Sequence, residues 1–83
     1  MFLKKLTDQK TISTNESSLM ILTRRQSEGL RYIADGYTAR NIVYRLGISE
    51  RMVRFHLEGA RNRLGAGSTT QAVYLATKAG LID

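Results

Sequence analysis

The segment GISERMVRFHLEGARNRLG, residues 47–65, combines an apolar periodicity with many basic residues. On a helical wheel with about 100° per residue, four apolar side chains fall within roughly 40° of one another, namely Val53, Leu57, Ala60 and Leu64. The opposite arc, from roughly 80° to 200°, carries Arg51, Arg54, Phe55, Glu58, Arg61 and Asn62. The segment therefore predicts an amphipathic helix over residues 50–64, with a buried stripe and a basic outer face.

On its own, this outer face is also compatible with a solvated helix surface. Glu58 has the spacing to pair with Arg54 or Arg61 on such a surface. Phe55 argues against this interpretation, because a bulky aromatic ring gains little from facing water. The ring would be buried if the helix were covered on two sides. The sequence of the neighbouring helix is therefore needed to distinguish a solvated surface from a binding surface.

A repeated pattern of helix-capping residues flanks this helix and three other predicted helices. A Ser or Thr hydroxyl accepts hydrogen bonds from the free amides of a first helical turn, and a Gly closes the last turn. The pairs are Thr23 with Gly36, Thr38 with Gly47, Ser49 with Gly65, and Ser68 with Gly80. Thr23 with Gln26 and Ser68 with Gln71 also predict capping boxes. We therefore expect an all-α four-helix bundle with helices over residues 24–35, 39–46, 50–64 and 69–79.

The apolar residues of the other helices are expected to complete the core. They are Leu30, Ile33, Ala34, Ile42, Val43, Leu46, Ala72, Val73, Leu75, Ala76 and Ala79, followed by Leu81 and Ile82. Residues 1–21 include the polar, turn-rich stretch TISTNESS and are predicted to form a flexible N-terminal arm or linker. Residues 22–83 form the predicted domain.

Composition and charge narrow the classes of function. The chain has 83 residues, no cysteine, a single His56 and a net charge of +6. This excludes a cysteine-based zinc site, and no nucleophile–base pair or paired carboxylates are apparent, so an enzyme is not expected. No stretch is long and apolar enough for a membrane span, and a cytoplasmic location is expected by default. All nine arginines fall between Arg24 and Arg63, which favours a polyanionic partner.

The short helix over residues 39–46 indicates a function for the basic outer face of the helix that follows it. The turn Leu46-Gly47-Ile48-Ser49 joins it to the basic helix, which is the arrangement of a helix-turn-helix. The second helix of that motif enters the major groove of DNA, where arginine recognises guanine and apolar groups meet the thymine methyl. Thr38, Arg40 and Arg45 would then lie near phosphates.

Residues 22–82 resemble the LuxR/FixJ/GerE-type helix-turn-helix domain of bacterial transcription regulators. The matching residues are Leu22-Thr23, Arg25, Glu28, Leu30, Ala34, Gly36, Ile42, Leu46-Gly47-Ile48-Ser49-Glu50, Val53, His56-Leu57, Leu64-Gly65 and Ala72-Val73. The runs FHLEGARNRLGA, TQAV and AGLI are most similar to the quorum-sensing branch. As a combined pattern the match is specific, although a single piece such as LGIS is weak.

The resemblance implies roles for individual residues. The base-contacting positions of the family match Arg54, Phe55 and Glu58, and Arg51 on the same face completes the predicted set. The phosphate-contacting positions would be Thr38, Arg40, Arg45, Ser49, Arg61 and Asn62. The last helix would form a homodimer contact through Thr69, Ala72, Val73, Ala76 and Thr77. His56 is expected to brace helix packing rather than to contact a base.

Several residues depart from the family pattern. At six positions this sequence has a residue other than the one that is usual in the family, namely Gln26, Gly29, Asn41, Val43, Gly59 and Thr69. Gly29 and Gly59 are each expected to weaken a helix interior by about 0.5–1 kcal/mol relative to alanine. Glu58 places an acid on the groove-facing side, where it repels phosphate. A DNA affinity below that usual for the family is therefore expected.

The first hypothesis is sequence-specific binding of double-stranded DNA by a homodimeric transcription regulator. The alternative is a stand-alone interaction module that pairs with a full-length regulator of the same family and modulates or blocks it. Such a regulator, or RNA polymerase, would be a further protein partner. No cofactor, metal, membrane or small-molecule ligand is expected. Family members usually carry a receiver or signal-binding domain, and these residues contain neither, so a stand-alone domain, an excised piece and a truncated relative all remain open.

Overall fold

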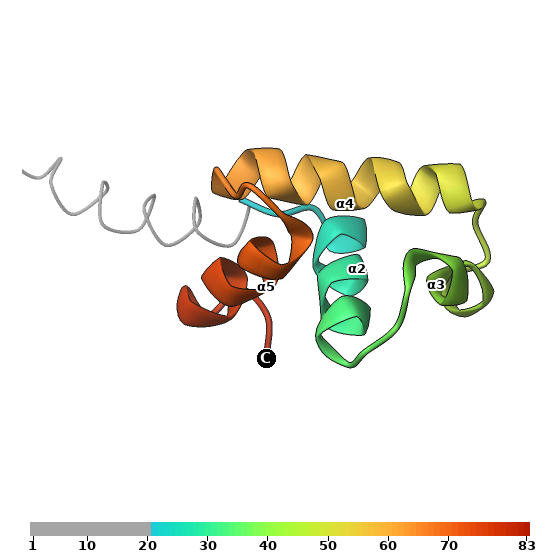
Figure 1. The fold of residues 1–83 in the computed structure, drawn as a ribbon, viewed down its shortest axis with the longest axis horizontal. Coiled ribbons are helices and arrows are strands. Elements are labelled where there is room, and N and C mark those ends of the chain that lie inside the picture. The colour runs from blue at the N-terminus through green and yellow to red at the C-terminus, as the bar shows by residue number, and fades with distance from the viewer. Residues whose placement is uncertain (1–20) are drawn as a thin grey trace, which may run out of the picture.

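Four helices make up residues 21–83, the part of the chain that the computed structural model describes (Figure 1). They are α2 (Arg24–Ala34), α3 (Ala39–Leu46), α4 (Glu50–Leu64) and α5 (Thr69–Lys78). The predicted all-α fold is confirmed, and no strand occurs within these residues. Helices α2 and α5 each end one residue earlier than predicted, because Asp35 and Ala79 form their C-caps. The predicted arm lies outside the described residues except for Ile21.

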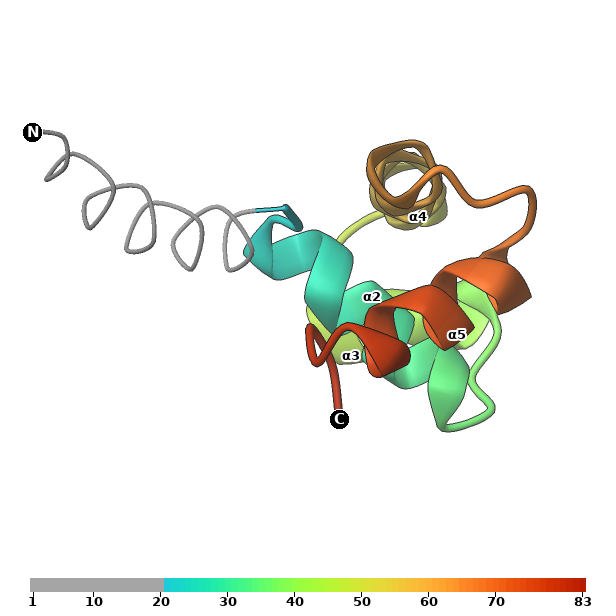
Figure 2. The same ribbon diagram turned by 90° about the vertical axis from the view of Figure 1, so that its left-hand side faces the viewer.

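The longest helix, α4, lies along one side of the bundle, with the other three packed beneath it (Figure 1). Figure 2 looks along α4 and shows α2 and α5 side by side on its inner face. In the last turn of α4, the Arg63 guanidinium donates a hydrogen bond to the Ile21 carbonyl at 3.0 Å. The last turn of α4 is thereby joined to the point where the chain enters the domain.

The core is built from small and medium apolar side chains of all four helices and of the segments just before α2 and after α5. Its buried members are Leu22, Leu30, Ala39, Ile42, Val53, Leu57, Ala60, Ala72, Ala76 and Ile82. The predicted stripe of α4 is confirmed, with Leu64 only partly buried. Ala34 and Ala79 were expected in the core and are exposed, because they lie at the ends of α2 and α5, beyond the packed part of each helix.

The helix caps follow the predicted pattern of capping residues, with one correction. The Thr23 hydroxyl accepts from the Gln26 amide at 3.1 Å, and the Gln26 side-chain oxygen accepts from the Thr23 amide at 2.9 Å. The box predicted at the start of α5 is only half formed. The Ser68 hydroxyl accepts from the Gln71 amide, but the Gln71 side-chain oxygen accepts from Gly67, one residue upstream.

Gly29 and Gly59 lie where α2 and α4 cross closely. A Cβ on Gly29 would be 3.0 Å from Cδ2 of Leu57, and one on Gly59 would be 2.6 Å from Nε2 of Gln26. Gln26 is buried, and its capping box restrains its side chain. The expectation that the two glycines merely weaken their helices is therefore incomplete, because they also make room for the crossing.

This packing predicts an unusual response to Gly59→Ala. In a helix interior the substitution normally stabilises by about 0.5–1 kcal/mol. We expect no such gain here, because the new methyl group displaces the Gln26 amide and breaks the capping box of α2. In a Gln26→Ala background the gain should return. Urea denaturation of the four proteins measures the free energies of unfolding, and an equal effect of Gly59→Ala in both backgrounds would contradict the packing.

Candidate nucleic-acid interface

The connection between α3 and α4 is a three-residue turn that starts a new helix at a sharp angle. Gly47 ends α3 with a φ of 69°, in the left-handed region that favours glycine. Ile48 packs against the core, and the Ser49 hydroxyl accepts from the Met52 amide at 3.1 Å. The predicted helix-turn-helix is thus present, with its second helix on the outside of the bundle.

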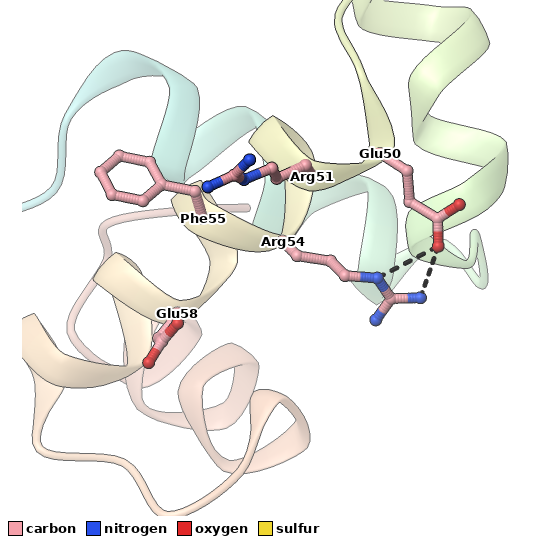
Figure 3. Close-up of a pocket in the computed structure, with 5 residues that line it drawn as sticks. All are labelled: Glu50, Arg51, Arg54, Phe55 and Glu58. Carbon is pink, nitrogen blue, oxygen red and sulfur yellow. Dashed lines mark hydrogen bonds and ion pairs between the residues drawn. The ribbon is translucent and has the colours of Figure 1, made fainter.

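Five side chains line an open hollow on the outer face of α4 (Figure 3). They are Glu50, Arg51, Arg54, Phe55 and Glu58. Four of these are the residues that sequence analysis proposed for base contacts, and all four are exposed. The structure therefore brings the predicted base-contacting set together on one surface. Glu50 belongs to the same surface and was not among the predicted site residues.

Arg54 is held by Glu50, the first residue of α4. One carboxylate oxygen of Glu50 accepts from Arg54 Nη2 at 2.6 Å and from Arg54 Nε at 3.1 Å. The pairing of Glu58 with Arg54 or Arg61, which a solvated face would have favoured, does not occur, and Glu58 forms no ion pair within residues 21–83. An acid that precedes an arginine by four residues at a helix N-terminus is the better oriented partner.

Phe55 projects from the same face into solvent. Its side chain is 64% exposed, and its ring meets the edge of His56 at a centroid distance of 5.5 Å. Burial of α4 on two sides is therefore excluded for the described chain. An exposed ring beside two arginines has no packing function in this fold, which leaves it free to contact a partner.

Three of the residues proposed for phosphate contact belong to α3 and its N-cap, namely Thr38, Arg40 and Arg45. The Thr38 hydroxyl accepts from the Asn41 amide at 3.1 Å, and the Asn41 side-chain oxygen accepts from the Thr38 amide at 3.4 Å, which completes a capping box not predicted from the sequence. Arg40 is exposed, and Arg45 donates to the Tyr37 hydroxyl at 2.6 Å. Arg40 lies in the first turn of α3 and Arg45 in its last turn, next to the connection to α4.

The remaining proposed phosphate contacts lie at the two ends of α4. Ser49 caps its first turn. Arg61 and Asn62 lie in the last turn, about 15 Å from Arg51 along the helix axis. Asn62 is exposed, whereas Arg61 is partly buried, and its Nε lacks a hydrogen-bond partner among the described residues. These residues therefore do not form one cluster with the hollow.

The residues proposed for a dimer contact on α5 divide into two groups. Ala72 and Ala76 have no exposed surface and serve the core alone, so their proposed contact with a partner is corrected. Thr69 and Val73 are partly buried, and Thr77 is exposed. Tyr74, which was not among the predicted contact residues, is 59% exposed, and the ammonium group of Lys78 lies 5.7 Å from its ring centroid.

Two kinds of feature are absent from residues 21–83. No group of His, Cys, Asp and Glu side chains in this region is arranged to hold a metal ion. None of the helices there combines the length and the apolar character needed to cross a lipid bilayer.

The turn between α3 and α4, together with an exposed basic face on α4, defines a helix-turn-helix domain. Residues 20–76 match the family model described as bacterial regulatory proteins, luxR family. The solved structure of the transcription factor GerE superposes with a TM-score of 0.73 at 28% identity, covering 76% of this chain and 94% of that one. This chain belongs to the LuxR/GerE family of bacterial regulatory proteins.

Curated relatives extend this assignment. The regulator RpaR of Rhodopseudomonas palustris is 41% identical over 80 residues, which cover 96% of this chain and 31% of RpaR. LuxR of Aliivibrio fischeri is 35% identical over 75 residues, covering 90% and 30%. YdfI of Bacillus subtilis is 39% identical over 61 residues, covering 74% and 29%. The chain therefore spans less than a third of the length of these relatives.

The exposure of Phe55 predicts a contrast with its neighbour Leu57. We expect Phe55→Ala to change the free energy of unfolding by less than about 0.5 kcal/mol, because the ring leaves no cavity behind. Leu57→Ala should lower it by about 2–5 kcal/mol, because the stripe of α4 is packed. Urea denaturation followed by circular dichroism compares the two. A loss for Phe55→Ala close to that for Leu57→Ala would show that the ring is part of the core.

Proposed function

We propose that the chain binds double-stranded DNA sequence-specifically, with α4 in the major groove, as part of a transcription regulator. The observation that carries this proposal is the joint exposure of Arg51, Arg54, Phe55 and Glu58 on the outer helix of a helix-turn-helix. A groove about 12 Å wide admits one helix and presents hydrogen-bonding groups that distinguish all four base pairs. The net charge of +6 supplies attraction to any DNA.

The four side chains offer three kinds of base contact. The guanidinium groups of Arg51 and Arg54 match the O6 and N7 acceptors of guanine. The Phe55 ring suits the methyl group of thymine, and the Glu58 carboxylate accepts from the amino group of cytosine. Because Glu58 has no internal ion pair in the described chain, this contact would not have to break one.

Phosphate contacts would hold α4 in the groove. Arg40 and Arg45 extend from α3 and would contact the backbone beside the groove, together with the Thr38 and Ser49 hydroxyls at the helix N-termini. Arg61 and Asn62 would reach a more distant phosphate from the last turn of α4. Contacts of this kind set orientation and salt dependence without selecting a sequence.

We further infer that the regulator acts as a homodimer in the cytoplasm. Exposed residues of α5, with Thr77 and Tyr74 at the centre, would meet the same face of a second copy about a two-fold axis. A role in quorum sensing is part of this proposal, because RpaR is named a quorum sensing-dependent transcriptional regulator. We regard the chain as a binding domain without catalytic activity.

Two arginine variants separate base reading from phosphate binding. Arg54→Ala should reduce the preference for a selected duplex over random DNA by about 1–3 kcal/mol. Arg40→Ala should weaken both duplexes equally and lower the slope of log K against log salt by about 1. Fluorescence anisotropy at several salt concentrations measures both effects, with the selected duplex obtained from a random library.

Equal loss on both duplexes for Arg54→Ala would remove this residue from the base-reading set. Weak binding by the unmodified chain, with no preference for any duplex, would overturn DNA reading as a whole. The alternative of an interaction module that pairs with a full-length regulator would then be favoured.

The dimer proposal is tested by Thr77→Arg. Two like charges facing each other across the two-fold axis should weaken self-association about tenfold, which corresponds to 1.4 kcal/mol. Sedimentation equilibrium of the unmodified chain and the variant measures the dissociation constants. Ala34→Arg is the matched control, because it adds the same charge at an exposed position of α2. The same weakening in both variants, or a purely monomeric unmodified chain, would argue against the α5 contact.

A further inference from the structure

We propose that Glu50 is a positioning residue that orients Arg54 for reading guanine, and that it thereby determines base specificity. The inference rests on the DNA-binding function proposed above. It assigns a role to an acidic residue at the edge of the basic face, where negative charge would otherwise only oppose binding to DNA.

The geometry joins the two residues through a single oxygen. Oε2 of Glu50 accepts from both Nε and Nη2 of Arg54, at 3.1 and 2.6 Å. Both side chains remain accessible, with 66% of Arg54 and 42% of Glu50 exposed. In Figure 3 Arg54 turns toward Glu50, whereas Arg51 extends toward Phe55. The two arginines of the hollow are thus oriented differently, and only Arg54 has a carboxylate partner there.

The ion pair leaves one edge of the Arg54 guanidinium available. An arginine carries five N–H donors in a fixed planar fork. Glu50 engages the Nε donor and one Nη2 donor, so the two Nη1 donors and the second Nη2 donor stay free. Two parallel donors on that terminal edge match the O6 and N7 acceptors of guanine. Because the side chain is already oriented, less conformational freedom is lost on binding.

The negative charge of Glu50 has a second and opposite effect. It lies in the hollow that would face the groove, so it repels the phosphates of any duplex. Glu50 should therefore lower the affinity for random DNA while it raises the preference for the selected site. A residue that only stabilised the N-terminus of α4 through the helix dipole would not produce opposite changes in these two quantities.

Helix α2 offers a matched control. Glu28 pairs with Arg24 at the same i,i+4 spacing, with a distance of 3.4 Å, and it also pairs with Arg25. Glu28 does not line the hollow on α4. Replacing Glu28 therefore removes the same negative charge as replacing Glu50, and it also breaks an ion pair within a helix. It does not alter the partner of any arginine in the hollow on α4.

The experiment compares Glu50→Ala, Glu28→Ala, Arg54→Ala and the Glu50→Ala/Arg54→Ala double variant with the unmodified chain. Affinities for the selected duplex and for random DNA are measured by fluorescence anisotropy, and circular dichroism confirms that each protein is folded. For Glu50→Ala we expect tighter binding to random DNA. The specificity ratio, which is the affinity for the selected duplex divided by that for random DNA, should fall by at least about fivefold. This factor corresponds to the lower limit of the discrimination provided by one bidentate base contact. Glu28→Ala should leave the ratio unchanged.

The double variant distinguishes positioning from direct contact. If Glu50 acts through Arg54, adding Glu50→Ala to Arg54→Ala should not lower the ratio further. An equal drop in both backgrounds would mean that Glu50 acts independently of Arg54, which overturns the positioning role. An unchanged ratio in Glu50→Ala, with a site-specific unmodified chain, overturns the inference and leaves the proposed function intact. No preference in the unmodified chain would overturn the proposed function itself and this inference with it.

Discussion

Burial of a narrow stripe on α4 is the constraint on which the other features depend. Val53, Leu57 and Ala60 pack inward against α2, α3 and α5. Because this stripe occupies only one side of a long helix, most of the helix circumference remains outside the bundle. The arginines and Phe55 are therefore displayed on a rigid element that the core holds in place. A site on a packed helix is positioned more accurately than one on a loop.

Local signals in the sequence were sufficient to locate the helices. A hydroxyl before each helix and a glycine after it act within a few residues, so Ser49 and Gly65 define α4 without knowledge of the rest of the fold. Where several local partners compete, spacing along the chain does not determine which hydrogen bond forms. Gln71 had two neighbouring amides within reach, and its side chain accepts from Gly67 rather than from Ser68. Local spacing cannot distinguish these two geometries.

Features that depend on contacts between helices, or on side-chain rotamers, were not predictable in the same way. The family resemblance placed Ala72 and Ala76 at a partner surface as well as in the core, whereas packing against the core leaves them no exposed surface. The helical wheel put Arg54 and Glu58 on one arc, but it carries no information on rotamers. The choice of Glu50 as the partner of Arg54 therefore emerged only from the structure.

The crossing of α2 and α4 also has an evolutionary consequence. The side-chain amide of Gln26 occupies the space that a side chain on residue 59 would need. A larger residue at position 59 is therefore expected to depend on residue 26, because the Gln26 amide has to move before the new side chain fits. Substitutions at these two positions are then expected to accumulate more readily when residue 26 changes first, because that change opens the space beside residue 59.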